Sequence, residues 1–569
     1  QGFLPINFQI TQWEGLKPFY DQLLNRELTS SEVFRKWILD RSKLEEAIAE
    51  DAGWRYINMT RDTTNEAYKQ QYETYVKDIL PRIIPLAHQL DEKTVQSPYA
   101  QELIQKLDFD PLMPGFDLMV RCMENDIKIY RSENVPILTQ LQLQAREYGK
   151  TAGAMTVEVE GKELTLQQAA AYLEVQDRAL REEAYQKINT RRLQDKDELN
   201  DLYTSMVKDR HQVARNAGFD NFRDYTFAAL RRFDYTPQHC FAFHQGVEEI
   251  VVPFLNELVQ ERKKMLGVAA LKPWDQAVDP TGKPPLKPFS KGTDLLQKTI
   301  AIFDRLDPFL GECLRTMEAR GNFDLESRKG KAPGGYNFPL EKSGIPFIFM
   351  NAAATFKDMI TMLHEGGHAV HSFLMHELPL NTFKHTTAEM AELASMSMEL
   401  LTMDQWDLFF DNEADLKRAK KQHLENIISR LAWIATIDKF QHWVYEQPTH
   451  TLEQRKAAWN EIFSSFSDNV TEWSGQEAFK DFLWQKQLHL FEVPFYYIEY
   501  GIAQLGAIAV WRNYQKNPKQ GLQDYLNALK LGYTRPLPYM YETAGISFDL
   551  SVQYISELVA FVRDRWQAL

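Results

Sequence analysis

The chain has 569 residues, of which 44% are hydrophobic, 25% charged and 12% aromatic. This composition is that of a globular protein, and the length exceeds what one hydrophobic core usually supports. The net charge of −14 at pH 7 disfavours nucleic acid and anionic membranes as partners. The sequence has no apolar run of membrane-spanning length, so we expect no membrane insertion.

The three cysteines, Cys122, Cys240 and Cys313, lie far apart without a C-x-x-C spacing. We expect buried thiols rather than a disulfide or metal site, which favours a reducing compartment and predicts a cytoplasmic protein. Residues 1–10 lack the basic start and long apolar stretch of an intact signal peptide. The sequence leaves the oligomeric state open.

Helical periodicity dominates the chain. Residues 30–51 begin with two serines and continue with apolar residues at helical spacing, which predicts a helix. The same pattern predicts helices at 65–93, 117–147, 166–194, 196–217, 236–266, 293–320, 415–447, 453–466 and 519–531.

Strand patterns are few. Residues 155–165 alternate in polarity around Gly161 and predict a small hairpin, and the apolar run 345–354 predicts a strand that 334–340 can join. The proline-rich segment 268–292 is typical of a linker, and 328–336 lacks the spacing of a phosphate loop. We therefore expect a mainly α protein with a small sheet, divided into an N-terminal helical lobe (1–195) and a second lobe (196–569) that holds the motif described next.

Residues 364–368, His-Glu-Gly-Gly-His, match H-E-x-x-H. On a helix the two histidines lie about 40° apart around the axis, so both can bind one Zn²⁺, while Glu365 can take a proton from metal-bound water. Only helical spacing aligns both histidines, so we expect a helix despite the glycines. We hypothesise that a side chain at Gly367 would obstruct the substrate or a neighbouring helix, so that Gly367→Leu lowers activity more than stability.

A catalytic zinc needs a third protein ligand. Residues 386–401 offer Glu389, Glu392 and Glu399, and spacing alone does not select among them. Asp358 or Glu399 could orient a ligand imidazole through a hydrogen bond. His371 lies almost above His364 on the helix, and we expect it to support the site rather than to bind the metal.

The motif "HEGGHAVHSF" followed by "EMAELASMSMELL" resembles the M3 (thimet oligopeptidase-like) metallopeptidases, and most closely the oligoendopeptidase F branch. This resemblance implies one Zn²⁺ per chain, with Glu392 as the third ligand beside His364 and His368. It places Glu399 as the second acidic residue of the same motif. It also implies two helical lobes around a deep cleft that admits short peptides, excludes folded proteins and closes on its substrate.

The segments 330–339 and 345–365 resemble the region before the zinc helix of that family, where a short strand pairs with the substrate backbone. The resemblance implies substrate contacts at this strand. The candidates are Gly334, Gly335, Phe349, Asn351 and Ala352.

Residues 489–507 contain four hydrogen-bond donors within twelve positions: His489, Tyr496, Tyr497 and Tyr500. Such donors can stabilise the oxyanion formed during peptide hydrolysis. By resemblance to the family, His489 and Tyr500 lie near the scissile carbonyl, together with either Tyr496 or Tyr497.

We therefore predict a zinc endopeptidase of short peptides, in which Glu365 acts as general base. One alternative is a zinc carboxypeptidase or dipeptidyl carboxypeptidase on the same scaffold. Another is a non-catalytic peptide-binding protein with a structural zinc, although such sites usually have four protein ligands, often cysteines.

Overall fold

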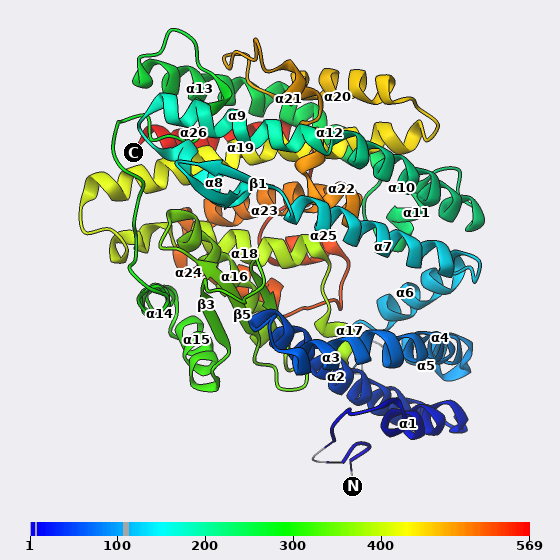
Figure 1. Ribbon diagram of the computed structural model, residues 1–569. Coiled ribbons are helices and arrows are strands. Elements are labelled where there is room, and N and C mark those ends of the chain that lie inside the picture. The colour runs from blue at the N-terminus through cyan, green and yellow to red at the C-terminus, as the bar shows by residue number, and fades with distance from the viewer. Residues whose placement is uncertain (1, 6–7, 106–112) are drawn as a thin grey trace. The chain divides into compact units, whose positions relative to one another are not determined.

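The computed structural model describes residues 2–5, 8–105 and 113–569, and these are mainly helical, as predicted (Figure 1). Two compact units divide the chain: unit 1 is Gln1–Lys128, Lys287–Leu416 and Gly506–Phe548, and unit 2 is Ile129–Leu286, Lys417–Leu505 and Asp549–Leu569. The single division after residue 195 and the deep cleft stay predictions. Within the described ranges, the helices are too short or too polar to cross a membrane.

Unit 1 contains helices from all three of its segments and one sheet. Its elements are α1 (Trp13–Asn25), α2 (Ser31–Arg61), α3 (Glu66–Thr74), η1 (Tyr75–Ile79), α4 (Leu80–Gln96), α5 (Pro98–Gln105), α6 (Phe116–Ile129), α14 (Gly292–Leu306), α15 (Pro308–Arg320), β3 (Phe323–Glu326), β4 (Tyr336–Phe338), β5 (Phe347–Ala352), α16 (Phe356–Met375), α17 (Asn381–Lys384), α18 (Ala388–Leu401), η6 (Met403–Leu408), α24 (Pro518–Leu529) and α25 (Leu537–Thr543).

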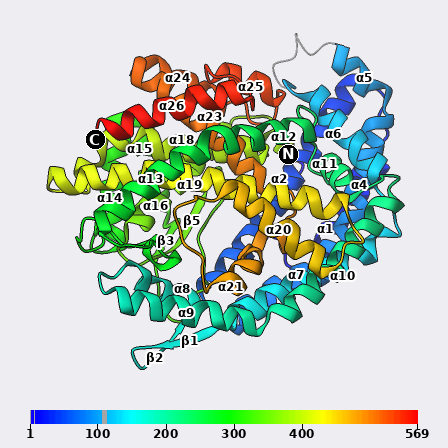
Figure 2. The same cartoon turned by 90° about the horizontal axis from the view of Figure 1, so that it is seen from above.

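Unit 2 is helical apart from one hairpin, and its C-terminal helix packs on α12 and η4 (Figure 2). Its elements are α7 (Asn134–Gly153), β1 (Thr156–Val159), β2 (Lys162–Thr165), α8 (Leu166–Ala170), η3 (Ala171–Glu174), α9 (Arg178–Gln194), α10 (Lys196–Asn216), α11 (Phe222–Ala229), α12 (Pro237–Gly246), η4 (Val247–Val251), α13 (Val252–Leu266), η5 (Pro273–Asp275), α20 (Leu452–Phe466), α21 (Glu477–Asp481), η7 (Leu483–Lys486), α22 (Leu488–Glu492) and α26 (Val552–Gln567). Helices α19 (Glu413–Glu446) and α23 (Tyr497–Lys516) contribute residues to both units, and the last residue of α6, Ile129, belongs to unit 2.

Local sequence signals explain where helices begin. Ser30 caps α2 by accepting a hydrogen bond from the amide of Val33 at 3.2 Å. The predicted helix 293–320 is in fact two helices, because Asp307 accepts a hydrogen bond from the amide of Phe309 and Pro308 occupies the first turn of α15. The predicted helix 117–147 likewise divides into α6 and α7.

The two sheets are small. The predicted hairpin is β1–β2, and Glu160 and Gly161 between its strands have φ angles of 50° and 74°. The second sheet has the order β3-β5-β4, with β5 parallel to β3 and antiparallel to β4. Strands β4 and β5 lie within predicted segments. Strand β3 was not predicted, since four residues are too few for its alternation to be recognised.

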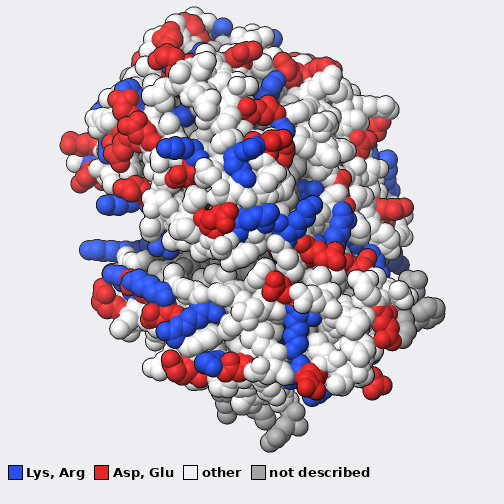
Figure 3. Space-filling view, turned by 90° about the vertical axis from the view of Figure 1, so that its right-hand side faces the viewer, with Lys and Arg blue, Asp and Glu red and all other residues white. Residues whose placement is uncertain are grey.

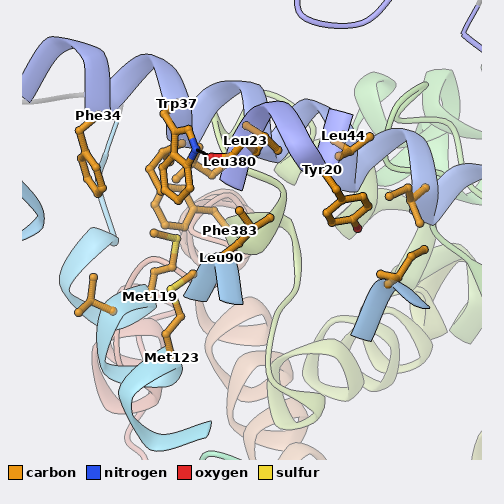
Figure 4. Packing of buried hydrophobic residues seen from close by; sticks show 14 of the residues in the cluster. Tyr20, Leu23, Phe34, Trp37, Leu44, Leu90, Met119, Met123, Leu380 and Phe383 are labelled. Carbon is orange, nitrogen blue, oxygen red and sulfur yellow. Dashed lines mark hydrogen bonds between the residues drawn. The ribbon is translucent and has the colours of Figure 1, made fainter. Parts of the chain in front are cut away.

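A hydrophobic cluster in unit 1 joins its N-terminal helices to the segment between α16 and α18. Leu380 and Phe383 pack in the same cluster as Trp37 of α2 (Figure 4). Beside it, Lys384 Nζ lies 2.9 Å from Glu46 Oε1, and both side chains are buried. The N-terminal helices therefore support the region that carries the H-E-x-x-H motif.

A buried carboxylate ties the loop before β4 to the sheet. Asp324 of β3 accepts hydrogen bonds from Arg61, Arg328 and Lys331. The Lys331 side chain is fully buried and also donates to backbone carbonyls of β3 and β5. The segment 328–336 is therefore a plain loop, as predicted, and its lysine has a structural partner.

Charged side chains of both signs are interspersed on the face drawn in Figure 3. Such mixing keeps the local potential low. The described residues of this face therefore present no continuous basic surface.

We predict that Asp324→Asn lowers the free energy of unfolding at pH 7 by roughly 3–5 kcal/mol, because buried Lys331 loses its counter-charge. Burial opposes ionisation, yet hydrogen bonds from three cationic side chains hold the pKa of Asp324 well below its usual range. Its stabilising effect is therefore present above the unfolded pKa and is lost as the pH falls through the folded pKa. Chemical denaturation should show that the difference in unfolding free energy between the wild type and Asp324→Asn becomes smaller as the pH falls below about 4.

The matched control is Asp21→Asn, which removes an exposed ion pair with Lys17 in the same unit. It should change the unfolding free energy by less than about 0.5 kcal/mol. Equal effects of the two substitutions would contradict the importance of the buried network.

Candidate functional site

The H-E-x-x-H motif lies in the middle of helix α16, as predicted. Thr355 and Asp358 form a capping box at the start of this helix, each side chain accepting a hydrogen bond from the other residue's amide. Met359 and Leu363, one turn apart, are fully buried and hold one face of the helix in the core of unit 1. The cap and this face fix the helix despite the two glycines.

Both glycines of the motif are in close contact with protein. A Cβ atom at Gly367 would lie 2.6 Å from Cα of Ser395 and 2.8 Å from the carbonyl oxygen of Ala394, both in α18. A Cβ atom at Gly366 would lie 2.7 Å from the ring of Phe303. Of the two obstructions hypothesised for Gly367, the structure identifies the neighbouring helix.

Three side chains in unit 1 could hold one metal ion. His364 and His368 of α16 and Glu392 of α18 each offer a ligand atom within 4.8 Å of the other two. His364 Nε2 lies 3.3 Å from Glu392 Oε2. Two imidazole nitrogens and one carboxylate oxygen are a donor set that suits Zn²⁺ with an open fourth position. The group contains Glu392 and not Glu389, the alternative that spacing left open.

Glu399 lies on the other side of His364. Its Oε1 atom is 2.7 Å from His364 Nδ1, and its side chain is almost fully buried. A carboxylate in this position fixes the tautomer and the orientation of the ring. The two nitrogens of His364 are thus directed to Glu392 and Glu399.

Burial controls the protonation of the group. Burial raises the pKa of Glu365 to about 7 and lowers the pKa of His368 to about 4. Burial opposes the charged form of His364 too, but hydrogen bonds to Glu392 and Glu399 raise its pKa well above the usual value. At neutral pH His368 is therefore a neutral imidazole with a lone pair, and Glu365 is poised to exchange a proton.

Asp358 and His371 lie outside the metal-binding group. Asp358 Oδ2 accepts hydrogen bonds from the amides of Ala353 and Thr355 and from the Thr355 hydroxyl, so this carboxylate caps α16 rather than orients an imidazole. His371 is buried, which lowers its pKa to about 3, and it forms a hydrogen bond with the backbone of Leu529. His371 therefore links α16 to α24.

In the sheet of unit 1, β4 is an edge strand and lies beside the helix that carries the motif. Strand β5 has β3 on one side and β4 on the other, and the ring of Phe349 is fully buried and stacked on Tyr336 at 4.8 Å. Phe349 therefore belongs to the core, and the expectation that it contacts a peptide is wrong.

The other residues expected at the substrate strand shape the entry to β4. Asn351 Nδ2 donates to the carbonyl oxygens of Ala332 and Gly334, at 2.9 and 2.8 Å. Gly334 has a φ angle of 98°, and a Cβ atom at Gly335 would lie 3.3 Å from the nearest backbone oxygen. Ala352 is paired with β3. These residues fix the turn that leads into β4.

Sequence reasoning missed Asn337. Its Nδ2 atom donates to the carbonyl oxygen of Glu365 at 3.2 Å and so attaches β4 to the motif helix. An asparagine in a three-residue strand carries no spacing signal, so only the structure reveals this contact.

In unit 2, the four predicted donors form one group of rings. His489 lies 4.8 Å from Tyr497 and 5.8 Å from Tyr500 between ring centroids, and Tyr496 lies 5.4 Å from Tyr500. Gln487 Nε2 lies 2.7 Å from His489 Nδ1. The sequence prediction that these side chains act together therefore agrees with their grouping.

Tyr496 and Tyr497 differ in their surroundings. The side chain of Tyr497 forms hydrogen bonds with Trp433 and Gln487, and burial raises its pKa. The hydroxyl of Tyr497 thus has partners within unit 2. These contacts do not select between the two tyrosines.

A tight turn before these tyrosines is held by residues that the sequence did not single out. Phe495 has a φ angle of 64°, which is unusual for a residue other than glycine. Gln441 Oε1 accepts a hydrogen bond from its amide, and buried Arg232 donates to its carbonyl oxygen. Arg232 also donates to Glu499 at 2.7 Å. This clamp fixes the start of α23.

The helical fold, the H-E-x-x-H helix and the glutamate of α18 define a helical protein with a candidate metal-binding group of the metallopeptidase type. Residues 171–559 match the model of peptidase family M3, and residues 3–111 match that of the peptidase M3 N-terminal domain. The chain belongs to peptidase family M3.

Individual relatives agree with the resemblance to the oligoendopeptidase F branch. The chain is 22% identical over 396 residues to the oligoendopeptidase F homolog of Borreliella burgdorferi, covering 66% of this chain and 63% of that protein. It is 22% identical over 418 residues to the plasmid oligoendopeptidase F of Lactococcus lactis subsp. cremoris, covering 72% and 66%. The chain thus spans slightly less than two thirds of these relatives. The structure of PZ peptidase A with an inhibitor matches with a TM-score of 0.89 and 28% identity, covering 100% and 99%.

We predict that Gly367→Ala lowers thermal stability and metal affinity together, because a methyl group there forces α18 and Glu392 away from α16. Overpacking of this kind costs roughly 1–3 kcal/mol. Displacing a ligand helix should weaken Zn²⁺ binding at the His364–His368–Glu392 group about tenfold or more. Thermal melts and metal competition titrations measure the two effects. The expectation that a larger side chain at Gly367 lowers activity more than stability stays a prediction.

Gly15→Ala is the control, since Gly15 is helical and a Cβ atom there would meet no neighbouring side chain or helix within 4 Å. It should leave metal affinity unchanged and stabilise the protein by about 0.5–1 kcal/mol. An unchanged melting temperature and metal affinity for Gly367→Ala would contradict the close packing.

Proposed function

We propose that this protein is a zinc-dependent endopeptidase that cleaves internal bonds of short peptides. The observation that carries the proposal is the grouping of His364, His368 and Glu392 beside the buried carboxylate of Glu365. Membership of peptidase family M3 supports it.

The donor set fits zinc. Imidazole nitrogens and a carboxylate bind Zn²⁺, and His364, whose pKa is raised in the metal-free site, would lose its proton when the metal binds. Glu399 is placed to orient His364 by a hydrogen bond, as carboxylates next to ligand histidines do in zinc sites. A bound Zn²⁺ would supply Lewis acidity that polarises a peptide carbonyl and lowers the pKa of water.

In the proposed reaction Glu365 moves the proton. It is buried and adjacent to a ligand histidine, and its pKa is raised to about 7. A carboxylate with such a pKa can accept a proton from the attacking water and return it to the leaving amine. The tie from Asn337 to the carbonyl oxygen of Glu365 holds this part of α16 in place.

We propose that the substrate backbone extends along the edge of β4. In the described sheet β4 pairs with β5 on one side only, and Asn337 attaches it to the motif helix. Adding a peptide as a further strand uses backbone hydrogen bonds, which are independent of sequence. This mode suits an enzyme that accepts varied short peptides.

We further propose that His489, Tyr500 and one of Tyr496 and Tyr497 stabilise the oxyanion. The family resemblance and the grouping of their rings in unit 2 support this role. Arg232 would act as a positioning residue by fixing the turn at Phe495.

We predict that Glu365→Gln lowers peptide hydrolysis by roughly 10²–10⁴-fold, the usual contribution of general acid–base catalysis. Its zinc content should equal that of the wild type, because Glu365 is not a proposed ligand. His368→Ala should lose one equivalent of zinc relative to the wild type. Hydrolysis assays and elemental analysis measure these outcomes, and a wild-type rate for Glu365→Gln would refute the mechanism.

Endopeptidase and exopeptidase activity can be separated with a graded set of peptides, free and blocked at both ends. We expect cleavage of internal bonds in the blocked peptides, identified by mass spectrometry. If only peptides with a free C-terminus are cleaved, the carboxypeptidase alternative replaces the proposal. Zinc binding without any cleavage would favour a peptide-binding protein.

We predict that Arg232→Met lowers kcat by about tenfold or more with a smaller change in KM. The reason is that Arg232 fixes the turn before the tyrosines that would stabilise the transition state. Zinc content should stay at the wild-type value. Arg232→Lys should keep more of kcat than Arg232→Met, because both hydrogen bonds come from the single nitrogen Nη2 and an ammonium can donate both.

The control is Arg563→Met, which removes a more exposed ion pair with Glu257 in the same unit. It should leave kcat and KM unchanged. If Arg232→Met lowers the melting temperature but not kcat, Arg232 has only a structural role.

A further inference from the structure

A second cluster of metal-binding side chains lies within unit 2. Cys240, Asp438 and His442 each offer a ligand atom within 4.8 Å of the other two. All three residues are buried, and Asp438 has no exposed surface. His244 joins the cluster through its Nε2 atom, which lies 2.8 Å from Asp438 Oδ2.

The cluster is built from two helical pairs. Cys240 and His244 are four residues apart on α12, and Asp438 and His442 are four residues apart on α19. This spacing places both members of a pair on one face of their helix. It is the same geometry that brings His364 and His368 together in unit 1, but here each helix also supplies a residue of another type.

Polar atoms of the cluster lack hydrogen-bond partners among the described residues. Asp438 Oδ1 and both ring nitrogens of His442 are buried without one. His442 Nε2 lies 3.3 Å from Asp438 Oδ2, but without the geometry of a hydrogen bond. Buried polar atoms are almost always satisfied by protein, water or an ion. These three atoms therefore indicate a missing partner.

The cluster places a carboxylate in the protein interior. Asp438 has no exposed surface, and its Oδ2 atom lies 2.8 Å from His244 Nε2 and 3.3 Å from His442 Nε2. A buried carboxylate needs hydrogen-bond donors or a cation close to it. Its other oxygen, Oδ1, has no such partner among the described residues.

A cavity of about 360 Å³ leads to the cluster. His244 and His442 are part of its wall, and it is also lined by four charged residues: Glu248, Glu446, Glu461 and Lys439. The net formal charge of these four residues is negative, which attracts cations. The cluster is thus buried and still accessible to an ion.

We propose that Cys240, Asp438 and His442 bind a divalent transition metal ion, with Zn²⁺ as the best match. Sulfur, nitrogen and carboxylate oxygen together suit Zn²⁺ and disfavour Mg²⁺ and Ca²⁺, which prefer oxygen ligands. His244 orients Asp438 by donating to Oδ2, as hydrogen-bonding partners of ligand carboxylates do at zinc sites. The site raises the number of metal ions from the predicted one to two per chain, and it does not depend on the proposed peptidase activity.

Cobalt titration of the metal-free protein tests the site. The His364–His368–Glu392 group contains no sulfur, whereas the new site contains Cys240. We therefore expect a thiolate-to-Co²⁺ charge-transfer absorption in the near ultraviolet from the wild type and equally from His368→Ala. Cys240→Ser and Asp438→Asn should lose it. Elemental analysis after zinc loading should give two equivalents for the wild type and one for His368→Ala and for Cys240→Ser.

The other two cysteines provide the control. Cys122 and Cys313 are buried outside the cluster, and the double variant Cys122→Ser/Cys313→Ser leaves Cys240 as the sole cysteine. This variant should keep the absorption, which makes the test independent of whether Cys240→Ser folds. Absence of the absorption from the wild type, with one zinc per chain, would overturn the proposal and leave water as the partner of the unsatisfied atoms. Loss of the absorption in the double variant would overturn it equally.

Discussion

The close packing of α16 on α18 is the constraint on which the candidate active site depends. The third ligand comes from a different helix than the two histidines, so the distance between the helices decides whether a metal can bind. That distance is set at Gly367, where the backbone of α18 occupies the space of a side chain. A glycine within a helix costs about 1 kcal/mol relative to alanine. At this position the glycine allows α18 to approach α16 and so brings Glu392 close to the two histidines.

The parts of the site that could be predicted from the sequence are local. The spacing of His364 and His368 follows from helical geometry alone, and capping and periodicity located most helices correctly. Glu392 required the family resemblance, because three glutamates on one helix satisfy the same spacing. In the structure Glu392 lies with His364 and His368, and Glu399 lies at the opposite nitrogen of His364.

The errors and omissions arise where long-range packing decides. Asp358 is used by the helix cap, and Phe349 lies in a strand with neighbours on both sides, and neither fact is visible in spacing. Arg232 and Gln441 meet at Phe495 from positions far away in the chain. The cluster around Asp438 was missed for the same reason, since its two helical pairs become meaningful only when α12 and α19 are known to meet.

The discontinuous composition of unit 1 has a consequence for biosynthesis. Tyr525, in its last segment, donates a hydrogen bond to the carbonyl oxygen of Ala394 at 2.6 Å, and His371 is hydrogen-bonded to Leu529. Both helices of the candidate metal-binding group therefore gain these two contacts only after the segment Gly506–Phe548 has emerged from the ribosome. Since domains fold as units during synthesis, a nascent chain that ends before this segment lacks the completed site. The packing around the candidate site is thus completed only near the end of synthesis, although its three proposed ligands lie between residues 364 and 392.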